Sequence, residues 1–148
     1  MQRPIRLAVR GIILRDDRLL LVNAYAGRTD LWCAPGGGAE PHQGLPENLV
    51  REVHEETGLT VGPGEICLVN EFHAPGEPFH QVDIYFRCTL VGGDPDGDWM
   101  DVEGVVTHRR WVTREELATL NVKPDSLGAI TWSTEPGTYY DPIEPIVR

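Results

Sequence analysis

Runs of β-branched and aliphatic residues, separated by short polar or Pro- and Gly-containing segments, predict a chain built largely from strands. The first two runs flank Asp16-Asp17, and this arrangement is typical of a β-hairpin. A second pair of runs flanks Pro75-Gly76-Glu77-Pro78. The expected strands are residues 7–14, 18–25, 31–34, 66–73, 80–90 and 105–112.

Residues 45–57 show the longer period of an amphipathic helix. Pro46 suits the first turn, where a missing backbone N–H costs nothing, and Gly58 suits the left-handed position that ends a helix. Three acids lie beside the apolar stripe, within an arc of about 100°. The apolar positions are Leu45, Leu49, Val50 and Val53, and the acids are Glu52, Glu55 and Glu56.

A capping box at Thr113-Arg114-Glu115-Glu116 predicts a second helix that continues through Leu120. The tail beyond it carries four prolines, and we expect this tail to wrap the surface. Strands combined with two helices indicate an α/β sandwich. We therefore expect a single domain over residues 1–148, with the proline-rich tail (residues 122–148) packed on it.

The three acids of the predicted helix repel one another, and Glu55 and Glu56 also lie where the helix dipole disfavours anions. A bound Mg²⁺ or Mn²⁺ would remove both penalties, because hard cations take carboxylate and phosphate oxygens as ligands. A solvated acidic face is the alternative interpretation of any Glu-Glu pair. Here a glycine-rich turn (residues 36–38), Arg51 and Gly58 accompany the acids, and this combination favours a cation site.

Residues 37–59 resemble the Nudix box of Nudix hydrolases. That motif reads Gly, five residues, Glu, seven residues, Arg-Glu, an aliphatic residue, any residue, Glu-Glu, any residue, Gly and an aliphatic residue. Upstream, residues 31–37 are similar to the family's Trp-x-x-Pro-Gly-Gly approach to the box. The resemblance implies a Nudix-type α/β/α sandwich with a mixed β-sheet between helices. The matching positions are Gly37, Arg51, Glu52, Val53, Glu55, Glu56, Gly58 and Leu59.

The resemblance also implies roles for individual residues. Glu52 matches the family position that binds metal and can act as general base, whereas Glu55 and Glu56 match metal ligands. Gly36 matches a backbone carbonyl that completes the metal's shell. Arg51 would orient Glu52, although a helix-surface pairing with Glu55 is an equally compatible interpretation. The implied cofactor is Mg²⁺ or Mn²⁺, and the implied reaction is attack of water on a pyrophosphate bond.

The acidic loop at residues 92–104 is the place where many Nudix enzymes recruit one further acid. Glu103 is our first candidate for this catalytic acid and Asp101 the second. A solvated acidic loop is the alternative interpretation.

One position departs from the box, because Gln43 stands where the family has its first Glu. In the family, that Glu helps to hold the Arg that orients the neighbouring acid. A Gln could accept a hydrogen bond from Arg51, but without the charge that strengthens such a bond. Our hypothesis is that Gln43 weakens the site without abolishing activity, and that nearby Glu40 is an alternative partner for Arg51.

The amino-acid composition limits the possible binding partners and indicates a cellular compartment. The net charge of −10 and a pI near 4.8 argue against a nucleic-acid backbone or an anionic membrane as partner. The three cysteines are well separated, so we expect reduced thiols in a cytoplasmic protein. Arginines interrupt the apolar character of the N-terminus, so we expect neither a signal peptide nor a membrane span.

Substrate choice rests on loops and strand ends outside the box. We expect a small phosphorylated partner, a nucleotide derivative, with Arg28 binding phosphate and with Tyr25 and His80 as further contacts. Each of these can equally be an ordinary core or surface residue. The other candidates are Glu71, Trp99 and Trp132.

Three functions remain open. The first is a metal-dependent hydrolase that cleaves the pyrophosphate bond of a nucleoside diphosphate linked to another moiety. The second is a non-catalytic Nudix-fold module that senses a nucleotide, which would be free to lose the acids that this chain keeps. The third is an isomerase or a decapping-type relative with a different class of substrate. The short chain and the missing basic face argue against decapping. The oligomeric state is open as well, with a homodimer as one candidate.

Overall fold

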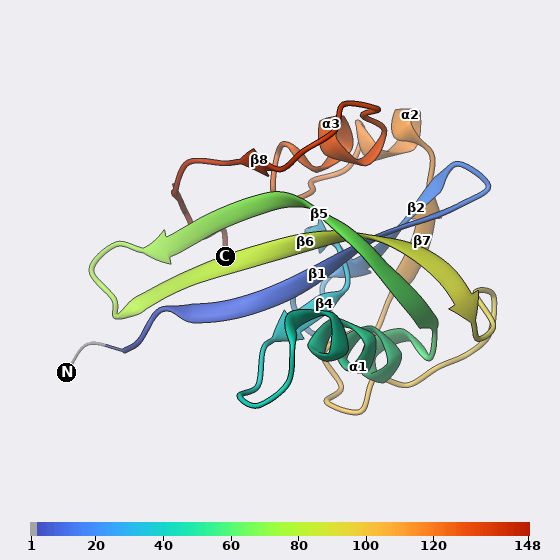
Figure 1. The fold of residues 1–148 in the computed structure, drawn as a ribbon, viewed down its shortest axis with the longest axis horizontal. Coiled ribbons are helices and arrows are strands. Elements are labelled where there is room, and N and C mark those ends of the chain that lie inside the picture. Colours follow the sequence, from blue (N-terminus) through green and yellow to red (C-terminus); the bar gives the residue numbers. More distant parts are fainter. Residues whose placement is uncertain (1–2) are drawn as a thin grey trace.

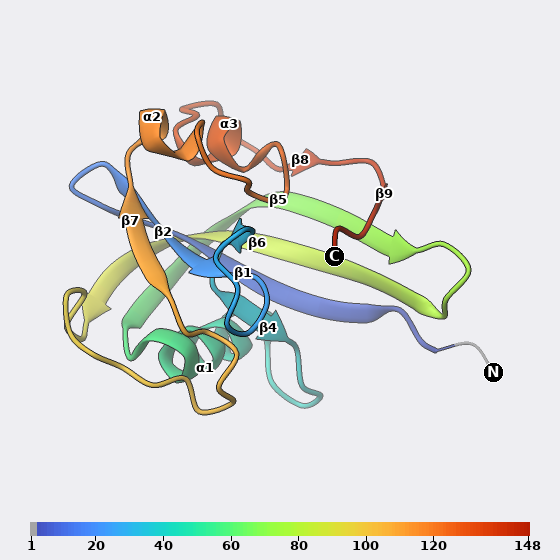
Figure 2. The ribbon, with the colours of Figure 1, turned by 180° about the vertical axis from the view of Figure 1, so that it is seen from behind.

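A computed structural model describes residues 3–148 and contains one large mixed β-sheet with helices on both sides (Figures 1 and 2). The strands are β1 (Arg6–Arg15), β2 (Arg18–Asn23), β3 (Trp32–Cys33), β4 (Gly36–Gly38), β5 (Thr60–Ala74), β6 (Phe79–Gly92), β7 (Arg109–Val112), β8 (Tyr139–Tyr140) and β9 (Glu144–Pro145). The helices are α1 (Leu45–Thr57), α2 (Arg114–Leu117) and α3 (Leu127–Thr131).

The central strands run in the order β3-β2-β1-β6-β5-β8. Strand β1 pairs parallel with β6 and antiparallel with β2 and β4, while β5 pairs antiparallel with β6. Strand β7 pairs with β2, and the short tail strands β8 and β9 run parallel to β5. The mixed sheet implied by the box is therefore confirmed.

Two apolar clusters lie on opposite faces of the sheet because neighbouring strand residues point to opposite sides. Helix α1 covers one face, where Leu49 and Val53 pack on Val9, Ile13 and other strand residues. On the other face, Leu127 of α3 joins Leu19, Leu21 and Tyr85, with Leu117 of α2 packed against them. Figure 1 shows α1 below the sheet and both short helices above it, which confirms the sandwich.

The turn of the predicted hairpin and both ends of the predicted helix lie at the residues that the sequence indicated. Asp16 and Asp17 both adopt positive φ angles, 50° and 60°, as a two-residue turn between twisted strands requires. Pro46 lies in the first turn of α1. Gly58 ends the helix with φ 74° and donates its N–H to the carbonyl of His54 at 2.8 Å.

Several predicted boundaries were wrong. The glycine segment is not only a turn but a strand, β4, which pairs with β1. Residues 105–108 lie outside β7 because side chains take over their backbone N–H groups: Asp101 binds those of Val105 and Val106, and Asn23 those of 107 and 108. Helix α2 ends earlier than expected, β5 begins earlier, and α3, β8 and β9 were not predicted.

The three cysteines are free, as expected for reduced thiols. Burial raises the pKa of Cys33 to about 11 and that of Cys88 to about 12, so both stay protonated at neutral pH. Within residues 3–148, no helix combines the length and the apolar character that a membrane span requires.

Candidate active site

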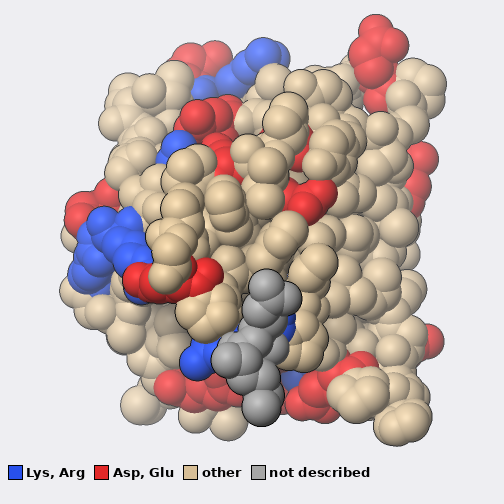
Figure 3. Space-filling view, turned by 90° about the vertical axis from the view of Figure 1, so that its left-hand side faces the viewer, with Lys and Arg blue, Asp and Glu red and all other residues tan. Residues whose placement is uncertain are grey.

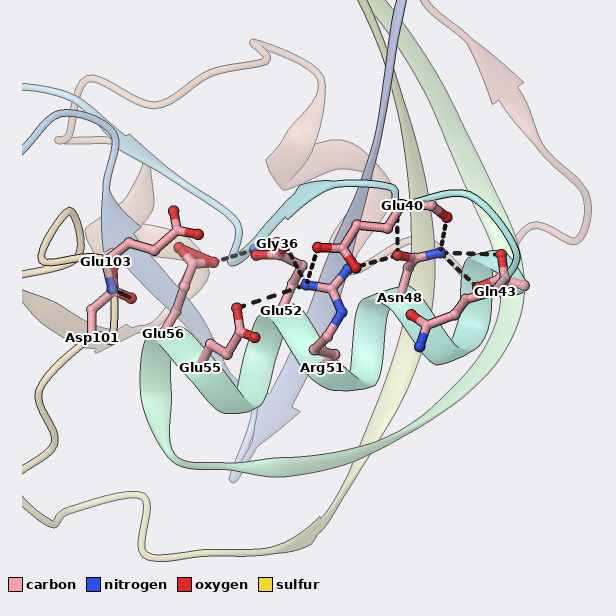
Figure 4. Close-up of polar contacts among 11 residues, drawn as sticks. Gly36, Glu40, Gln43, Asn48, Arg51, Glu52, Glu55, Glu56, Asp101 and Glu103 are labelled. Carbon is pink, nitrogen blue, oxygen red and sulfur yellow. Dashed lines mark hydrogen bonds and ion pairs between the residues drawn. The ribbon is translucent and has the colours of Figure 1, made fainter.

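The acids of α1 line a cavity of about 640 Å³ together with the glycine strand β4. Glu52, Glu55 and Glu56 project from one side of the helix towards β4, as Figure 4 shows. The cavity continues from there across the face of the sheet that carries α2 and α3, to the C-terminal residues 144–147. The helix pattern thus predicted the acidic wall of the cavity correctly.

Glycines in β4 allow the helix, the strand and β1 to approach closely. A Cβ added to Gly36 would overlap the carbonyl of Val9, and one added to Gly37 would overlap the carboxylate of Glu52. A Cβ on Gly38 would lie 2.7 Å from Nη2 of Arg6. At Gly36 the overlap is with backbone, so only glycine fits there, whereas at Gly37 and Gly38 a larger residue would displace the ends of the Glu52 and Arg6 side chains.

Glu56 is the most strongly perturbed acid of the site. The backbone N–H of Gly36 donates to its Oε1 at 2.7 Å. Burial nevertheless raises the pKa of Glu56 to about 8, and the nearby Arg10 only partly opposes this effect. Burial also raises the pKa of Glu52, against the lowering effect of Arg51. Both carboxylates would gain from a positive charge in the cavity.

Arg51 connects these acids to the start of the helix. Its Nη1 lies 2.9 Å from Glu52, 3.7 Å from Glu55 and 3.9 Å from Glu40. Its Nη2 donates to Oδ1 of Asn48 at 2.6 Å. Arg51 therefore contacts both acids that the sequence left open as its partners, Glu52 and the i,i+4 residue Glu55.

A ready-made cage of three acids was expected and is not present. Among residues 3–148, no three His, Cys, Asp or Glu side chains are grouped closely enough to hold an ion on their own. The reason is that Arg51 attracts Glu52 and Glu55, whereas the Gly36 N–H holds Glu56. Mg²⁺ commonly uses one or two carboxylates plus water and substrate phosphate. Glu52, Glu56 and the Gly36 backbone fit that kind of site by their oxygen chemistry and by the raised pKa of both acids.

The two acids predicted in the late loop have different surroundings. The carboxylate of Asp101 accepts three backbone N–H groups, from Glu103, Val105 and Val106, at 2.8–3.1 Å. Asp101 thereby fixes the loop. Glu103 lines the cavity near Glu52, whose pKa it helps to raise. Glu103 is thus the acid whose side chain remains available in the cavity.

Strand register places residues of the cavity floor in line across the sheet. Arg6 on β1 is opposite Gln81 on β6, which is opposite Phe72 on β5. Arg6 Nη1 donates to Gln81 Oε1 at 2.7 Å, and Gln81 donates to Asp83 at 2.7 Å. Asp83 also pairs with Arg10 at 3.5 Å.

Of the residues expected to contact substrate, Tyr25 lines the cavity and donates its hydroxyl to the carbonyl of Val147. Arg28 lies outside the lining and pairs with Asp30 at 2.8 Å. His80 also lies outside, bonded to Glu71 at 2.8 Å. Trp99 packs on Gly58 and His54, and Trp132 bonds Asp17.

The sequence interpretation missed several cavity residues. A usable signal existed on β6, where polar residues alternate with Val82, Ile84 and Phe86. On an inner strand covered on both faces, such polar positions need partners. The missed residues are Arg6, Arg10, Asn70, Phe72, Phe79, Gln81 and Asp83.

Charges of both signs are interspersed on one face of the molecule. On the face drawn in Figure 3, Lys and Arg form small groups next to Asp and Glu, and the described residues make no broad basic area there. Binding to a nucleic-acid backbone depends on clustered positive charge. This face therefore lacks the electrostatic footprint of a nucleic-acid interface.

Known proteins resemble this chain in sequence and fold. A putative ADP-ribose pyrophosphatase of Bacillus subtilis is 33% identical over 88 residues, which is 57% of this chain and 41% of that protein. Diphosphoinositol polyphosphate phosphohydrolase 3-alpha of Homo sapiens is 32% identical over 102 residues, 69% of this chain and 58% of that protein. The crystal structure of an ADP-ribose pyrophosphatase from Streptococcus suis superposes with a TM-score of 0.69 at 21% identity, covering 93% of this chain and 100% of that one.

The chain spans about half the length of the curated relatives that it matches. At 21% identity, the solved structure supports the fold alone. The family assignment rests instead on the sequence model of the NUDIX domain, which matches residues 4–132. The chain belongs to the NUDIX domain family.

Proposed function

We propose that this chain is a metal-dependent pyrophosphohydrolase whose substrate is a nucleoside diphosphate linked to another moiety. The observation that carries the proposal is the pair Glu52 and Glu56 beside Gly36, two partly buried carboxylates with raised pKa values in the lining of a large cavity. Such an arrangement costs stability in an empty protein and suits a cation that a diphosphate shares. Relatives named as ADP-ribose pyrophosphatases support the same class of substrate.

Glu52, Glu56 and the Gly36 carbonyl would hold Mg²⁺ or Mn²⁺, which supplies positive charge and makes bound water more acidic. Glu52 would take a proton from the attacking water, since it lines the cavity beside Gly37 and matches the family position that can act as general base. Arg51 keeps the Glu52 carboxylate aimed at the cavity. Glu103, on the loop between β6 and β7, is a further carboxylate in the cavity lining near Glu52.

Arg6 is the proposed anchor for the diphosphate group away from the acids. The two other basic residues of the lining are paired, Arg10 with Asp83 and Lys123 with Asp125. Within residues 3–148, no carboxylate oxygen lies within 4.0 Å of the Arg6 guanidinium, which Gln81 holds in place. Its remaining N–H groups can bind a phosphate oxygen.

Replacing Arg6 by Gln is expected to raise KM about tenfold and to change kcat less than threefold, as for the loss of one hydrogen bond to a charged group. Steady-state kinetics with the best substrate measure both constants. Arg28→Gln, an exposed arginine outside the cavity, is the matched control and should leave KM unchanged. An unchanged KM for Arg6→Gln would remove Arg6 from the substrate site.

The nucleoside is proposed to occupy the far end of the cavity. Phe72 and Phe79 form a tilted pair in the lining, with ring centroids 5.9 Å apart, and Tyr25 and the tail residues 145–147 line the same cavity. Aromatic faces of this kind stack on bases.

A substrate panel tests the proposed function. ADP-ribose, a nucleotide sugar, a nucleoside triphosphate and a dinucleoside polyphosphate are each incubated with Mg²⁺, Mn²⁺ or EDTA, beside Glu55→Gln and Glu56→Gln. We expect metal-dependent cleavage of at least one compound, which releases a nucleoside monophosphate. Binding without turnover across the panel would instead favour a nucleotide sensor.

A further inference from the structure

Asn48 is a buried amide inside the first turns of α1. Its exposed fraction is 0%. Asn is a poor helix former, because its side chain competes for backbone groups. Its burial in this helix therefore needs a reason beyond packing, and its hydrogen bonds supply one.

Both the oxygen and the nitrogen of the Asn48 amide make hydrogen bonds. Oδ1 accepts the backbone N–H of Glu40 at 2.8 Å and Nη2 of Arg51 at 2.6 Å. Nδ2 donates to the carbonyls of Glu40, Gln43 and Gly44 at 3.0–3.3 Å. These contacts exhaust what one amide can offer, and they join the segment after β4 to the helix that carries the acids.

Arg51 depends on this amide for its orientation. Residues 48 and 51 are three apart and so lie on the same side of the helix, as Figure 4 shows. The Nε of Arg51 is buried without a hydrogen-bond partner within the described part of the chain. The guanidinium is therefore held at its terminal nitrogens alone, by Asn48 on one side and by the acids on the other.

The Gln43 side chain does not take part. Its backbone carbonyl binds Asn48, but among residues 3–148 the hydrogen-bond and ion-pair partners of Arg51 are Asn48, Glu40, Glu52 and Glu55. Figure 4 draws no contact between the Gln43 amide and Arg51. The expected hydrogen bond between Gln43 and Arg51 was wrong, and the Glu40 alternative is a longer contact of 3.9 Å.

We propose that Asn48 is the positioning residue of this site: it orients Arg51, and through Arg51 the carboxylate of Glu52, in place of the acid missing at position 43. The inference rests on the proposed hydrolase function for its kinetic consequence only. Asn48 lies behind Arg51, with no exposed surface, and acts through that side chain. A neutral amide suffices because the oxygen faces a permanent cation.

Four variants test this role. Asn48→Ala removes the acceptor, and kcat is expected to fall about 10- to 100-fold, with KM changed less, as is typical when a partner behind a metal ligand is lost. Asn48→Asp keeps the acceptor for Arg51 and should keep kcat within about threefold, though it loses the bonds to the carbonyls. Gln43→Ala should leave kcat unchanged. Leu49→Ala, a fully buried neighbour of similar structural importance, should lower Tm without lowering kcat of the folded enzyme.

Two readouts do not require turnover. The guanidinium N–H signals of Arg51 in ¹⁵N NMR spectra of the metal-free protein, assigned with Arg51→Lys, should be resolved in the native protein and in Asn48→Asp but averaged in Asn48→Ala. Mn²⁺ binding measured by electron paramagnetic resonance should weaken about tenfold in Asn48→Ala. If the native protein turns over no substrate, the hydrolase proposal is refuted. The NMR test of Asn48 can still be carried out in that case.

Several results would contradict the proposed role of Asn48. Resolved Arg51 signals or an unchanged kcat in Asn48→Ala would overturn the inference, as would a loss of kcat in Gln43→Ala or Leu49→Ala equal to that in Asn48→Ala. If Asn48→Ala does not fold, Asn48→Asp and Gln43→Ala decide. A folded Asn48→Asp with averaged Arg51 signals would contradict the role of the amide oxygen.

Discussion

Glu52→Gln is expected to lower kcat by about 10²- to 10⁴-fold, because it removes the proposed general base together with a metal-binding carboxylate. Gln has nearly the same size as Glu and keeps an acceptor for Arg51 Nη1. In the native protein this nitrogen lies 2.9 Å from the Glu52 carboxylate. The structure around α1 should therefore persist. Initial rates at saturating substrate and Mg²⁺ measure the effect, with circular dichroism as the check on folding.

Glu47→Gln is the matched control for this change. Glu47 lies on the same helix, is exposed and does not line the cavity. Loss of its charge should reduce only the favourable interaction with the helix N-terminus, worth a few tenths of a kcal/mol, and leave kcat within about twofold. A Glu52→Gln enzyme that keeps more than a tenth of native kcat would exclude Glu52 as the base.

The sequence predicted the acidic half of the site because local rules determine it. One helical period aligns Glu52, Glu55 and Glu56, and Gly58 closes the helix by its positive φ. The hairpin at Asp16-Asp17 and the capping box at Thr113 are equally local and were confirmed. In each case the residues that decide the structure lie within a few positions of one another.

The floor of the cavity could not be predicted in this way. Arg6, Gln81 and Phe72 become neighbours only through the register of three strands, and two of those pairings join segments far apart in the chain. The same holds for β8 and β9, which are two residues long and exist through pairing with β5. Short tail strands of this kind carry no periodic pattern of their own.

The contacts of Asn48 could not be predicted from the sequence either. Nothing in the local sequence distinguishes Asn48 from the other polar residues of the helix, whereas Gln43 stands out because the motif departs there. The consequence of that departure depended on which side chain reaches Arg51, and residue spacing alone does not determine this. The burial of the amide and its five hydrogen bonds determine it.

The metal-free protein is expected to lose stability as pH rises from 5.5 to 8.5, and Glu56→Gln should reduce that loss. In the folded protein the pKa of Glu56 is raised to about 8 from 4.5 by burial. Between these values the unfolded chain is ionised while the folded chain still holds its proton, so stability present at low pH is lost as pH approaches 8. The raised pKa of Glu52 acts in the same direction.

The expected loss is on the order of a few kcal/mol, or roughly 5–10 °C in Tm. Thermal unfolding in EDTA at pH 5.5 and 8.5 measures it. Acids with lowered pKa values, Asp30, Glu71 and Glu116, titrate below this range and do not contribute. Glu47→Gln should follow the native protein at both pH values.

Added Mg²⁺ is expected to restore stability to the native protein at high pH. At pH 8.5 a bound cation should offset the cost of the ionised Glu56, so Mg²⁺ should raise the Tm of the native protein more than that of Glu56→Gln. Glu56→Gln would then be the more stable protein in EDTA and the inactive one with metal, as expected where a site keeps a destabilising charge for function. Equal pH slopes for the native protein and Glu56→Gln would show that Glu56 does not carry this cost, and the case for a cation beside Gly36 would lose its main physical support.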